Sequence, residues 1–315
     1  MYKIKKMKTR KFLFSLILGI SGFHVMAQDN LLKSLNDSIS ANGQTGHVTG
    51  TFKALYIVNM KTIEAPAAGA LNVEIQHRFG TVNTGAYNLF GLDFATLRLG
   101  LDYGITDRLS VGIGRSSYLE TYDGYLKYKL LQQTDHDMRM PVSVSLLGSS
   151  DYFSHRTEGT ADKIINSVYR FSYTGQVLIA RKFSRLFSME LIPTFIHYNM
   201  VSTTADKNNV FALAGGARMK INKRMAITVE YNYLFPNQLV SPLDPPSPPR
   251  TNSLSLGWDI ETGGHVFQFV FTNSQSMVES QYIGNTAGTW GKGYIYFGFN
   301  IARNFNLKPH NKAKA

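Results

Sequence analysis

Residues 71–79 read LNVEIQHRF, a stretch in which apolar and polar side chains alternate. Leu71 and Val73 belong to the mostly apolar series, whereas Asn72 and Glu74 belong to the polar series. Successive side chains of a β-strand point to opposite faces of the sheet. The alternation therefore predicts a strand with one apolar and one polar face.

The same alternation returns along the rest of the chain. It is strong over residues 95–103, 225–235, 254–260 and 295–301, and weaker over 109–114, 122–131, 141–147, 170–183, 187–200, 210–220 and 265–272. These stretches predict about twelve strands, most of them near the 9–11 residues that a tilted membrane-spanning strand requires.

The linkers between these strands alternate between long and short. Loops cover residues 80–94, 115–121, 148–168, 201–209, 236–252 and 273–292, and short turns cover 104–108, 184–185, 222–224 and 262–264. The moderate turn at 132–140 fits this pattern least well. Outer-membrane barrels have short periplasmic turns, long outer loops and an even number of strands. The sequence therefore predicts an all-β fold, a transmembrane antiparallel up-and-down β-barrel of about 12 strands.

The first residues predict export. Residues 3–11 carry six positive charges and no acid, and an apolar stretch of about a dozen residues follows, which is shorter than a membrane-spanning helix. We expect a signal peptide over residues 1–27, cleaved after Ala27. The predicted organisation continues with an N-terminal periplasmic or lumenal segment (28–66), the barrel (67–305) and a basic periplasmic tail (306–315).

Charge and composition exclude several classes of function. The formal net charge of the 315 residues is +12, but half of it leaves with the signal peptide, so the basic balance does not indicate nucleic-acid binding. The chain has no cysteine, which excludes disulfides and thiolate metal sites.

If the apolar strand face contacts lipid, the polar face lines the lumen. The predicted lumen-lining residues are Glu74, Arg78, Arg98, Asp102, Lys127, Glu190, Arg218, Glu230 and Asp259. Charges of both signs either pair across the interior and close it, or line a polar conduit. Small residues on the same face, among them Gly112, Gly114 and Gly216, predict free space and favour the conduit.

The sequence gives only weak indications of catalysis or metal binding. Ser149, Asp151 and His155 are close together in the predicted 148–168 loop, but loops are commonly rich in such residues. We predict no catalytic residues, no metal site and no cofactor. Apolar residues of the 273–292 loop, such as Tyr282 and Ile283, are expected to be buried against each other, in the lumen or on a partner.

Three motifs resemble those of an uncharacterised Gram-negative outer-membrane β-barrel family that is known only as a domain of unknown function. They are GLDFATLRLGLDYGITDRL at residues 91–109, DIETGGHVFQ at 259–268 and TWGKG at 289–293. The resemblance covers roughly residues 50–305. It implies a barrel and brings no activity with it.

The predicted function is a passive outer-membrane channel or transporter for small polar or amphipathic solutes. The first alternative is a non-conducting structural or interaction barrel that recruits a periplasmic or surface protein through its loops and N-terminal segment. A lipid-modifying enzyme of the outer leaflet is the second. The expected partners are outer-membrane lipid and the barrel-assembly machinery, and no nucleic acid.

Overall fold

The computed structural model describes residues 46–134, 140–155, 166–240 and 248–307. The chain divides into two compact units, Met1–Gly46 and His47–Ala315. The first unit, which includes the predicted signal peptide, lies almost wholly outside the described residues. The second unit contains every strand and helix discussed below.

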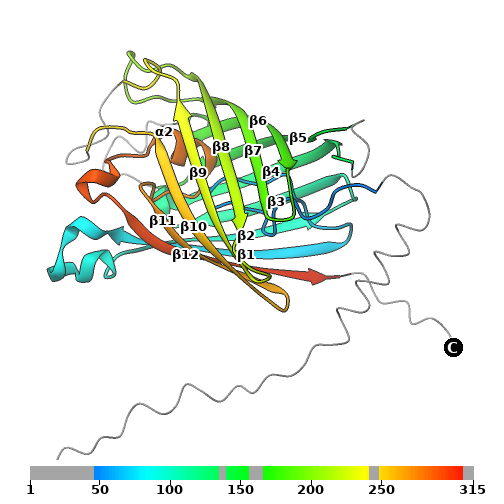
Figure 1. Ribbon diagram of the computed structural model, residues 1–315. Helices are drawn as coiled ribbons and strands as arrows, with labels where there is room; N and C mark the ends of the chain where they lie inside the picture. Colours follow the sequence, from blue (N-terminus) through cyan, green and yellow to red (C-terminus); the bar gives the residue numbers. More distant parts are fainter. Residues whose placement is uncertain (1–45, 135–139, 156–165, 241–247, 308–315) are drawn as a thin grey trace, which may run out of the picture. The chain divides into compact units, whose positions relative to one another are not determined.

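Twelve strands form one closed barrel, in which each strand is antiparallel to both neighbours and β1 closes the ring against β12 (Figure 1). The prediction of an antiparallel barrel of about twelve strands is confirmed. The strands are β1 (Ala70–Thr81), β2 (Ala95–Gly104), β3 (Leu109–Ser116), β4 (Thr121–Leu131), β5 (Ser143–Phe153), β6 (Phe171–Lys182), β7 (Phe187–Tyr198), β8 (Asn209–Lys220), β9 (Met225–Leu234), β10 (Ser253–Thr262), β11 (His265–Thr272) and β12 (Tyr296–Asn306).

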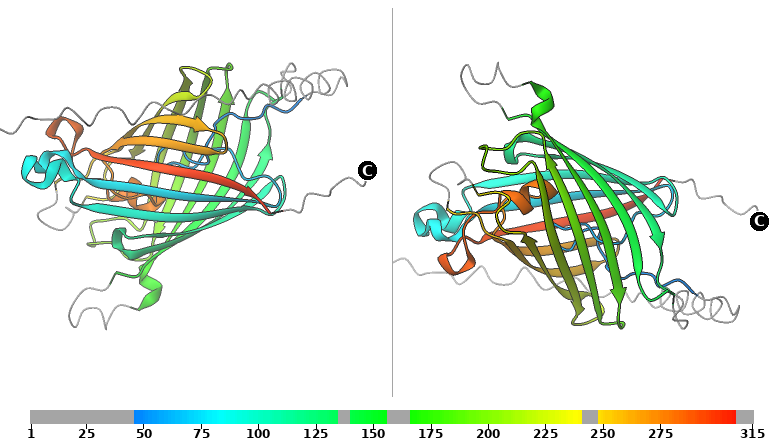
Figure 2. Two further views of the ribbon diagram at one scale, coloured as in Figure 1. Left: turned by 90° about the horizontal axis from the view of Figure 1, so that it is seen from below. Right: turned by 90° about the horizontal axis from the view of Figure 1, so that it is seen from above.

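The two ends of the barrel differ. At the terminal rim, where β1 begins and β12 ends, tight turns join β2 to β3, β6 to β7, β8 to β9 and β10 to β11. The opposite end, the loop rim, carries the longer connections and the short helices (Figure 2). These are η1 (Val82–Thr84), η2 (Ala86–Gly91), η3 (Tyr118–Glu120), η5 (Ser167–Arg170), α2 (Glu279–Gly284) and η6 (Trp290–Lys292). No helix in the described part of the chain is long and apolar enough to span a membrane.

Side chains alternate between the outside and the inside of the barrel. On β2, Leu99 and Leu101 are exposed on the outer surface, whereas Arg98 and Asp102 are buried in the lumen. A closed barrel satisfies its backbone hydrogen bonds between strands and can therefore present an apolar outer face to lipid. The apolar and polar series of the sequence thus correspond to the outer and inner surfaces of this strand.

One strand is longer than the sequence predicts. β5 continues through Phe153, whereas the sequence predicts a linker over residues 148–168. Gly148, Ser149 and Ser150 are residue types that favour turns. Pairing decides the conformation here, because Ser149 is opposite Tyr125 on β4 and Thr174 on β6. With both neighbours paired, the backbone hydrogen bonds outweigh the local turn preference.

The lumen is less polar than predicted. Leu147, Leu178, Ile192, Ile196 and Val210, on strands β5 to β8, are buried apolar residues of the interior core. This part of the wall faces an apolar surface inside the barrel, because Ile57, Met60 and Ile63 belong to the same buried cluster. The polar lumen of the prediction therefore holds for only part of the circumference.

Candidate functional site

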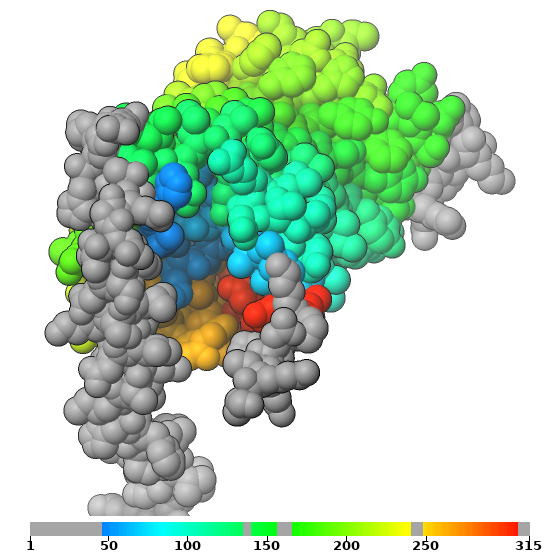
Figure 3. Space-filling view, turned by 90° about the vertical axis from the view of Figure 1, so that its right-hand side faces the viewer, coloured from blue at the N-terminus to red at the C-terminus, as the bar shows by residue number. Residues whose placement is uncertain are grey.

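A segment before the first strand fills the middle of the barrel. We call residues 51–64 the N-terminal plug. The plug enters from the terminal rim, where Figure 3 shows this part of the chain in blue within the ring of strands, and it reverses direction inside. The Ile57 N–H donates to the Met60 carbonyl at 2.8 Å, and the Thr62 N–H donates to the Leu55 carbonyl at 2.8 Å. Residues 51–60 alternate in the sequence as a strand would, with Phe52, Ala54, Tyr56 and Val58 in one series. In the structure this alternation belongs to a tight reversal inside the lumen and not to a further strand of the wall.

One carboxylate holds the tip of this plug. Glu230 of β9 accepts hydrogen bonds from the backbone N–H groups of Val58 at 3.1 Å, Asn59 at 2.9 Å and Met60 at 2.9 Å. Consecutive backbone N–H groups form an anion-binding concavity, and hydrogen bonds to an ionised acceptor are about twice as strong as neutral ones. The geometry makes Glu230 the main polar anchor of the tip.

The wall on strands β1, β11 and β12 binds the other polar groups of the tip. Arg78 donates to the Asn59 side-chain oxygen at 2.9 Å. Asn300 donates to the Val58 carbonyl at 2.8 Å, and Gln268 donates to the Ile57 carbonyl at 2.9 Å. A buried backbone without sheet pairing needs such partners, so these side chains replace the hydrogen bonds that a strand would have made.

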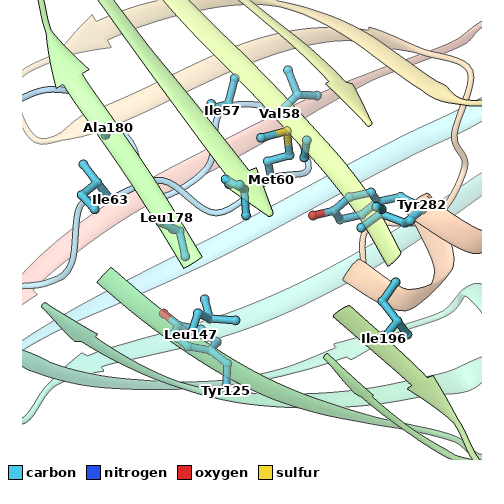
Figure 4. Close-up of a cluster of buried hydrophobic side chains, with 14 of the residues drawn as sticks. Ile57, Val58, Met60, Ile63, Tyr125, Leu147, Leu178, Ala180, Ile196 and Tyr282 are labelled. Carbon is cyan, nitrogen blue, oxygen red and sulfur yellow. The ribbon is translucent and has the colours of Figure 1, made fainter. Parts of the chain in front are cut away.

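The apolar side of the N-terminal plug packs against strands β5 to β8. Ile57, Met60 and Ile63 share one buried cluster with Leu178 and Ile192 (Figure 4). This contact explains the apolar part of the lumen wall. The N-terminal plug is therefore amphipathic, and each of its sides matches the wall that it contacts.

A second segment enters from the loop rim. We call residues 273–286, which include α2, the loop plug. The Ser280 hydroxyl donates to Asp151 at 2.8 Å, and the Gln281 amide donates to the Thr121 hydroxyl at 2.7 Å. Of the three fates expected for the apolar residues of this loop, the structure shows burial in the lumen, with Tyr282 and α2 inside the barrel (Figure 4).

The two plugs meet through one ion pair. The Lys61 ammonium of the N-terminal plug contacts the Glu279 carboxylate of the loop plug, and both side chains are at most 3% exposed. The same ammonium lies 4.6 Å from the ring centre of Tyr125 and 5.3 Å from that of Tyr56, within reach of cation–π attraction. Lys61 and Glu279 therefore form a latch between the segments that close the lumen from its two ends.

The structure places all nine predicted lumen-lining residues in the interior, each at most 6% exposed. They do not form a single site. Arg78, Glu230 and Lys127 bind the N-terminal plug, and Lys127 donates to the Thr62 carbonyl at 3.0 Å. Arg218 pairs with Asp259 at 3.4 Å.

The remaining predicted lumen residues mainly contact the wall. Asp102 accepts a hydrogen bond from the Tyr125 hydroxyl at 2.7 Å. Arg98 pairs with Asp123, its Nε donating at 2.9 Å, and its Nη1 also donates to the Tyr56 hydroxyl of the N-terminal plug at 3.3 Å. Glu74 is fully buried beside Asn72, whose amide nitrogen lies 3.4 Å from the carboxylate. Glu190 is buried on the lumenal face of β7.

Sequence reasoning missed Asp123, Lys61 and Glu279. Asp123 lies on the same strand face as Lys127, so a complete reading of that face would have included it. Lys61 and Glu279 lie outside the predicted strands of the barrel, and nothing local to either residue indicates its partner.

The prediction that small lumenal residues such as Gly112 and Gly216 leave free space is wrong. A Cβ at Gly112 would lie 2.2 Å from Cε1 of Tyr125 and 2.6 Å from Oδ1 of Asp102. At Gly216 it would lie 2.3 Å from Cδ1 of Ile57. These glycines make room for side chains of the wall and of the N-terminal plug.

Gly112→Ala is expected to destabilise the barrel by about 1–3 kcal/mol, because overpacking of a filled interior forces side chains from their preferred positions. Gly124→Ala is the matched control, since its Cβ would meet no atom closer than 3.7 Å. Urea unfolding of both variants in phospholipid vesicles measures the difference. Equal stability of the two variants would contradict the close packing around Tyr125.

The lumen beside the loop plug keeps polar groups without protein partners. Ser149 and Thr174 carry buried hydroxyl groups, and Asn232 a buried amide, with no hydrogen-bond partner among the described residues. Buried polar groups of this kind are normally bonded to water. This side of the interior is therefore a polar surface suited to hydration.

A cavity of about 350 Å³ lies at the loop rim next to the loop plug. Ser280 and Gln281 of the loop plug line it, together with Asp206 and Arg250 from the long loops and apolar side chains such as Met200. The lining combines both charge signs with apolar surface, which suits a small amphipathic solute.

The described residues do not assemble the hydrolase-type group considered from the sequence. Ser149 and Asp151 are buried on the lumenal face of β5, and Asp151 is bonded to Ser280, whereas His155 is exposed. Among the described residues, no group of three or more acidic or histidine side chains is placed to hold a metal ion. Residues 135–137 (Asp-His-Asp), whose side chains are also of types that bind metals, lie outside the described residues.

Comparisons with known proteins agree with this architecture. A family model described as a membrane bound beta barrel domain (DUF5777) matches residues 52–305. No curated protein matches the chain.

Solved structures with a similar fold include the NanC porin, an outer membrane channel from Pseudomonas putida F1 and Omp33 from Acinetobacter baumannii. The NanC porin is 9% identical with a TM-score of 0.44, and the match covers 74% of this chain and 98% of the porin. The Pseudomonas channel is 14% identical with a TM-score of 0.44, and the match covers 77% of this chain and 97% of the channel. Omp33 is 7% identical with a TM-score of 0.40, and the match covers 78% of this chain and 100% of Omp33.

Proposed function

Because this chain belongs to the family of membrane-bound β-barrel domains (DUF5777), we propose that it is an outer-membrane conduit for small polar or amphipathic solutes, held closed by two plugs. The proposal includes export through the cleaved signal peptide 1–27 and insertion by the barrel-assembly machinery. In the outer membrane the short turns of the terminal rim face the periplasm and the loop rim faces outward.

The observation that carries this proposal is how the lumen is closed. A twelve-strand barrel is wider than the small barrels that wall side chains fill by themselves. Here two segments that are not part of the wall occupy the interior, one from each end, and they meet at the Lys61–Glu279 latch. Closure by separate segments allows opening without loss of the strand pairing.

Three further features support a route for solutes. The cavity at the loop rim offers an entry site of about 350 Å³. Below it, the polar groups of Ser149, Thr174 and Asn232 offer hydrogen bonds to a passing polar solute or its water. The polar contacts of the N-terminal plug with Glu230, Arg78 and Gln268 can be exchanged for contacts with water when the segment moves.

Single-channel recording of the mature chain in a planar bilayer tests the proposal. We expect a barrel that is closed most of the time and shows brief, discrete and reproducible openings, because both plugs must move before ions pass. A difference in gel mobility between heated and unheated samples shows that the protein added to the bilayer is folded. A folded protein that never opens at either polarity would contradict the conduit.

One observation favours the interaction barrel as a second candidate. The η2 loop at the loop rim presents Tyr87 at 97% exposure and Leu89 and Phe90 at 55% each. Leu89 and Phe90 also have positive φ angles of 47° and 54°, so backbone strain accompanies their exposure. An exposed apolar loop suits a protein partner. Electrical silence combined with saturable binding of a purified partner, lost in Tyr87→Ser, would favour this candidate.

A further inference from the structure

We propose that the outer surface of strands β6 to β9 holds one anionic phospholipid at the terminal rim, with an acyl chain in an apolar groove and its phosphate at Arg181. This site lies on the lipid-facing side of the wall. It is therefore independent of whether the lumen conducts.

The groove follows β8, where two small residues stand between larger ones. On the outer face, Gly215 pairs with Leu191 of β7 and Tyr231 of β9, and Ala217 pairs with Met189 and Val229 in the same way. The small residues form the floor of the groove, and the larger side chains on each side form its walls.

The size and polarity of the groove suit an acyl chain. Its volume is about 470 Å³ and its lining is almost wholly apolar, and ligand pockets typically span about 300–1,000 Å³. A Cβ placed at Gly215 would meet no atom within 4 Å, so the floor is open. At membrane depth the only abundant apolar occupant is a lipid tail.

Several cationic side chains lie at the end of the groove that meets the terminal rim. Arg181 lines the groove, and its guanidinium carbon lies 5.2 Å from the ring centre of Phe183. The Nε atom of Arg181 is buried and has no hydrogen-bond partner among the described residues. The nearby turns add Arg185, Lys223 and Arg224, and residues 181–187 and 220–225 contain no acid.

This arrangement selects an anionic lipid. Arginine binds phosphate oxygens with two parallel hydrogen bonds, and long cationic side chains extend from apolar surfaces toward the headgroup level. Basic clusters beside membrane-spanning segments bind anionic headgroups. A zwitterionic lipid has the same tails and phosphate but a cationic headgroup, which the surrounding Arg and Lys side chains repel.

Native mass spectrometry of the detergent-purified mature chain tests the proposal with phosphatidylglycerol and phosphatidylethanolamine as probes. We expect one phosphatidylglycerol to stay bound at lipid concentrations where phosphatidylethanolamine is lost. Gly215→Leu fills the groove and Arg181→Gln removes the phosphate ligand, so each should weaken binding about tenfold.

Matched variants serve as controls. Gly175→Leu also adds a side chain to the outer surface where a Cβ meets no atom within 4 Å, but it lies outside the groove. Arg303→Gln removes an outer arginine of β12 at the same rim, whose guanidinium lies 4.8 Å from the Phe305 ring. Both controls should keep the lipid. Equal affinity for the two lipids, or binding by Gly215→Leu or Arg181→Gln that equals that of its control, overturns the proposal.

Discussion

Excision of the N-terminal plug is expected to turn a barrel that is closed most of the time into one that conducts almost continuously. The change replaces residues 53–63 with Gly-Ser-Gly. The structure allows this excision because the two ends of the segment already meet. The N–H groups of Thr51 and Phe52 donate to the Glu64 carboxylate at 2.8 and 3.2 Å.

The physical reason is the size of the space that the segment fills. Ile57, Val58 and Met60 are at most 1% exposed in the middle of the lumen, and a twelve-strand barrel is wider than those that wall side chains fill alone. Without the plug, Glu230 loses the three N–H donors of the tip and Arg78 loses Asn59 but keeps Asn300, so water can reach both side chains. We expect the open fraction of single-channel records to rise on the order of tenfold or more, since loss of the plug shifts the closed-to-open equilibrium.

Lys53→Gln is the control for this experiment. It changes the same segment at the terminal rim, where Lys53 is 55% exposed and lies 3.5 Å from Glu261, and it leaves the plug in place. Records from this variant should match those of the unchanged chain. If the excised barrel is folded and still silent, the loop plug alone closes the lumen and the N-terminal plug is not the gate.

Glu230→Gln is expected to release the tip of the N-terminal plug. An amide offers one oxygen and adds N–H donors, which would face the N–H groups of Val58, Asn59 and Met60. Hydrogen bonds to a charged acceptor contribute about 1.5–3 kcal/mol each, although the three do not add fully. A net loss of roughly 3 kcal/mol would raise the population of the undocked plug about a hundredfold.

The lack of cysteine gives a clean readout of this release. The chain contains none, so Val58→Cys introduces a single thiol at a position that is fully buried. Its rate of reaction with a membrane-impermeant maleimide should rise about a hundredfold when Glu230→Gln is added, because the rate follows the undocked population.

Glu74→Gln is the matched control. Glu74 is also fully buried on the lumenal face, but its carboxylate bonds to Asn72 and not to the plug. The control should leave the labelling rate of Val58→Cys unchanged. Equal rates in the two backgrounds would mean that Glu230 does not anchor the tip.

The latch and the lumen wall show why parts of this molecule could not be predicted from its sequence. Lys61 and Glu279 are 218 residues apart and come together only because the barrel closes around both plugs. The same closure sets the apolar wall of Leu178 and Ile192 against the N-terminal plug, which no pattern within β6 or β7 indicates. The sequence predicts that residues 149–151 lie in a linker, whereas pairing with β4 and β6 makes them strand.

The sequence by itself determined the barrel and its strand count, because both depend on a local period of two that must match an apolar exterior. β1 and β2 lie within two residues of their predicted bounds, and charged residues such as Arg98 and Glu230 are inside, as the alternation requires. Only the tertiary structure decided what fills the lumen. The alternation over residues 51–60 does not show where the N-terminal plug lies, and the conformation of both plugs depends on contacts with Glu230, Asp151 and other wall residues far along the chain.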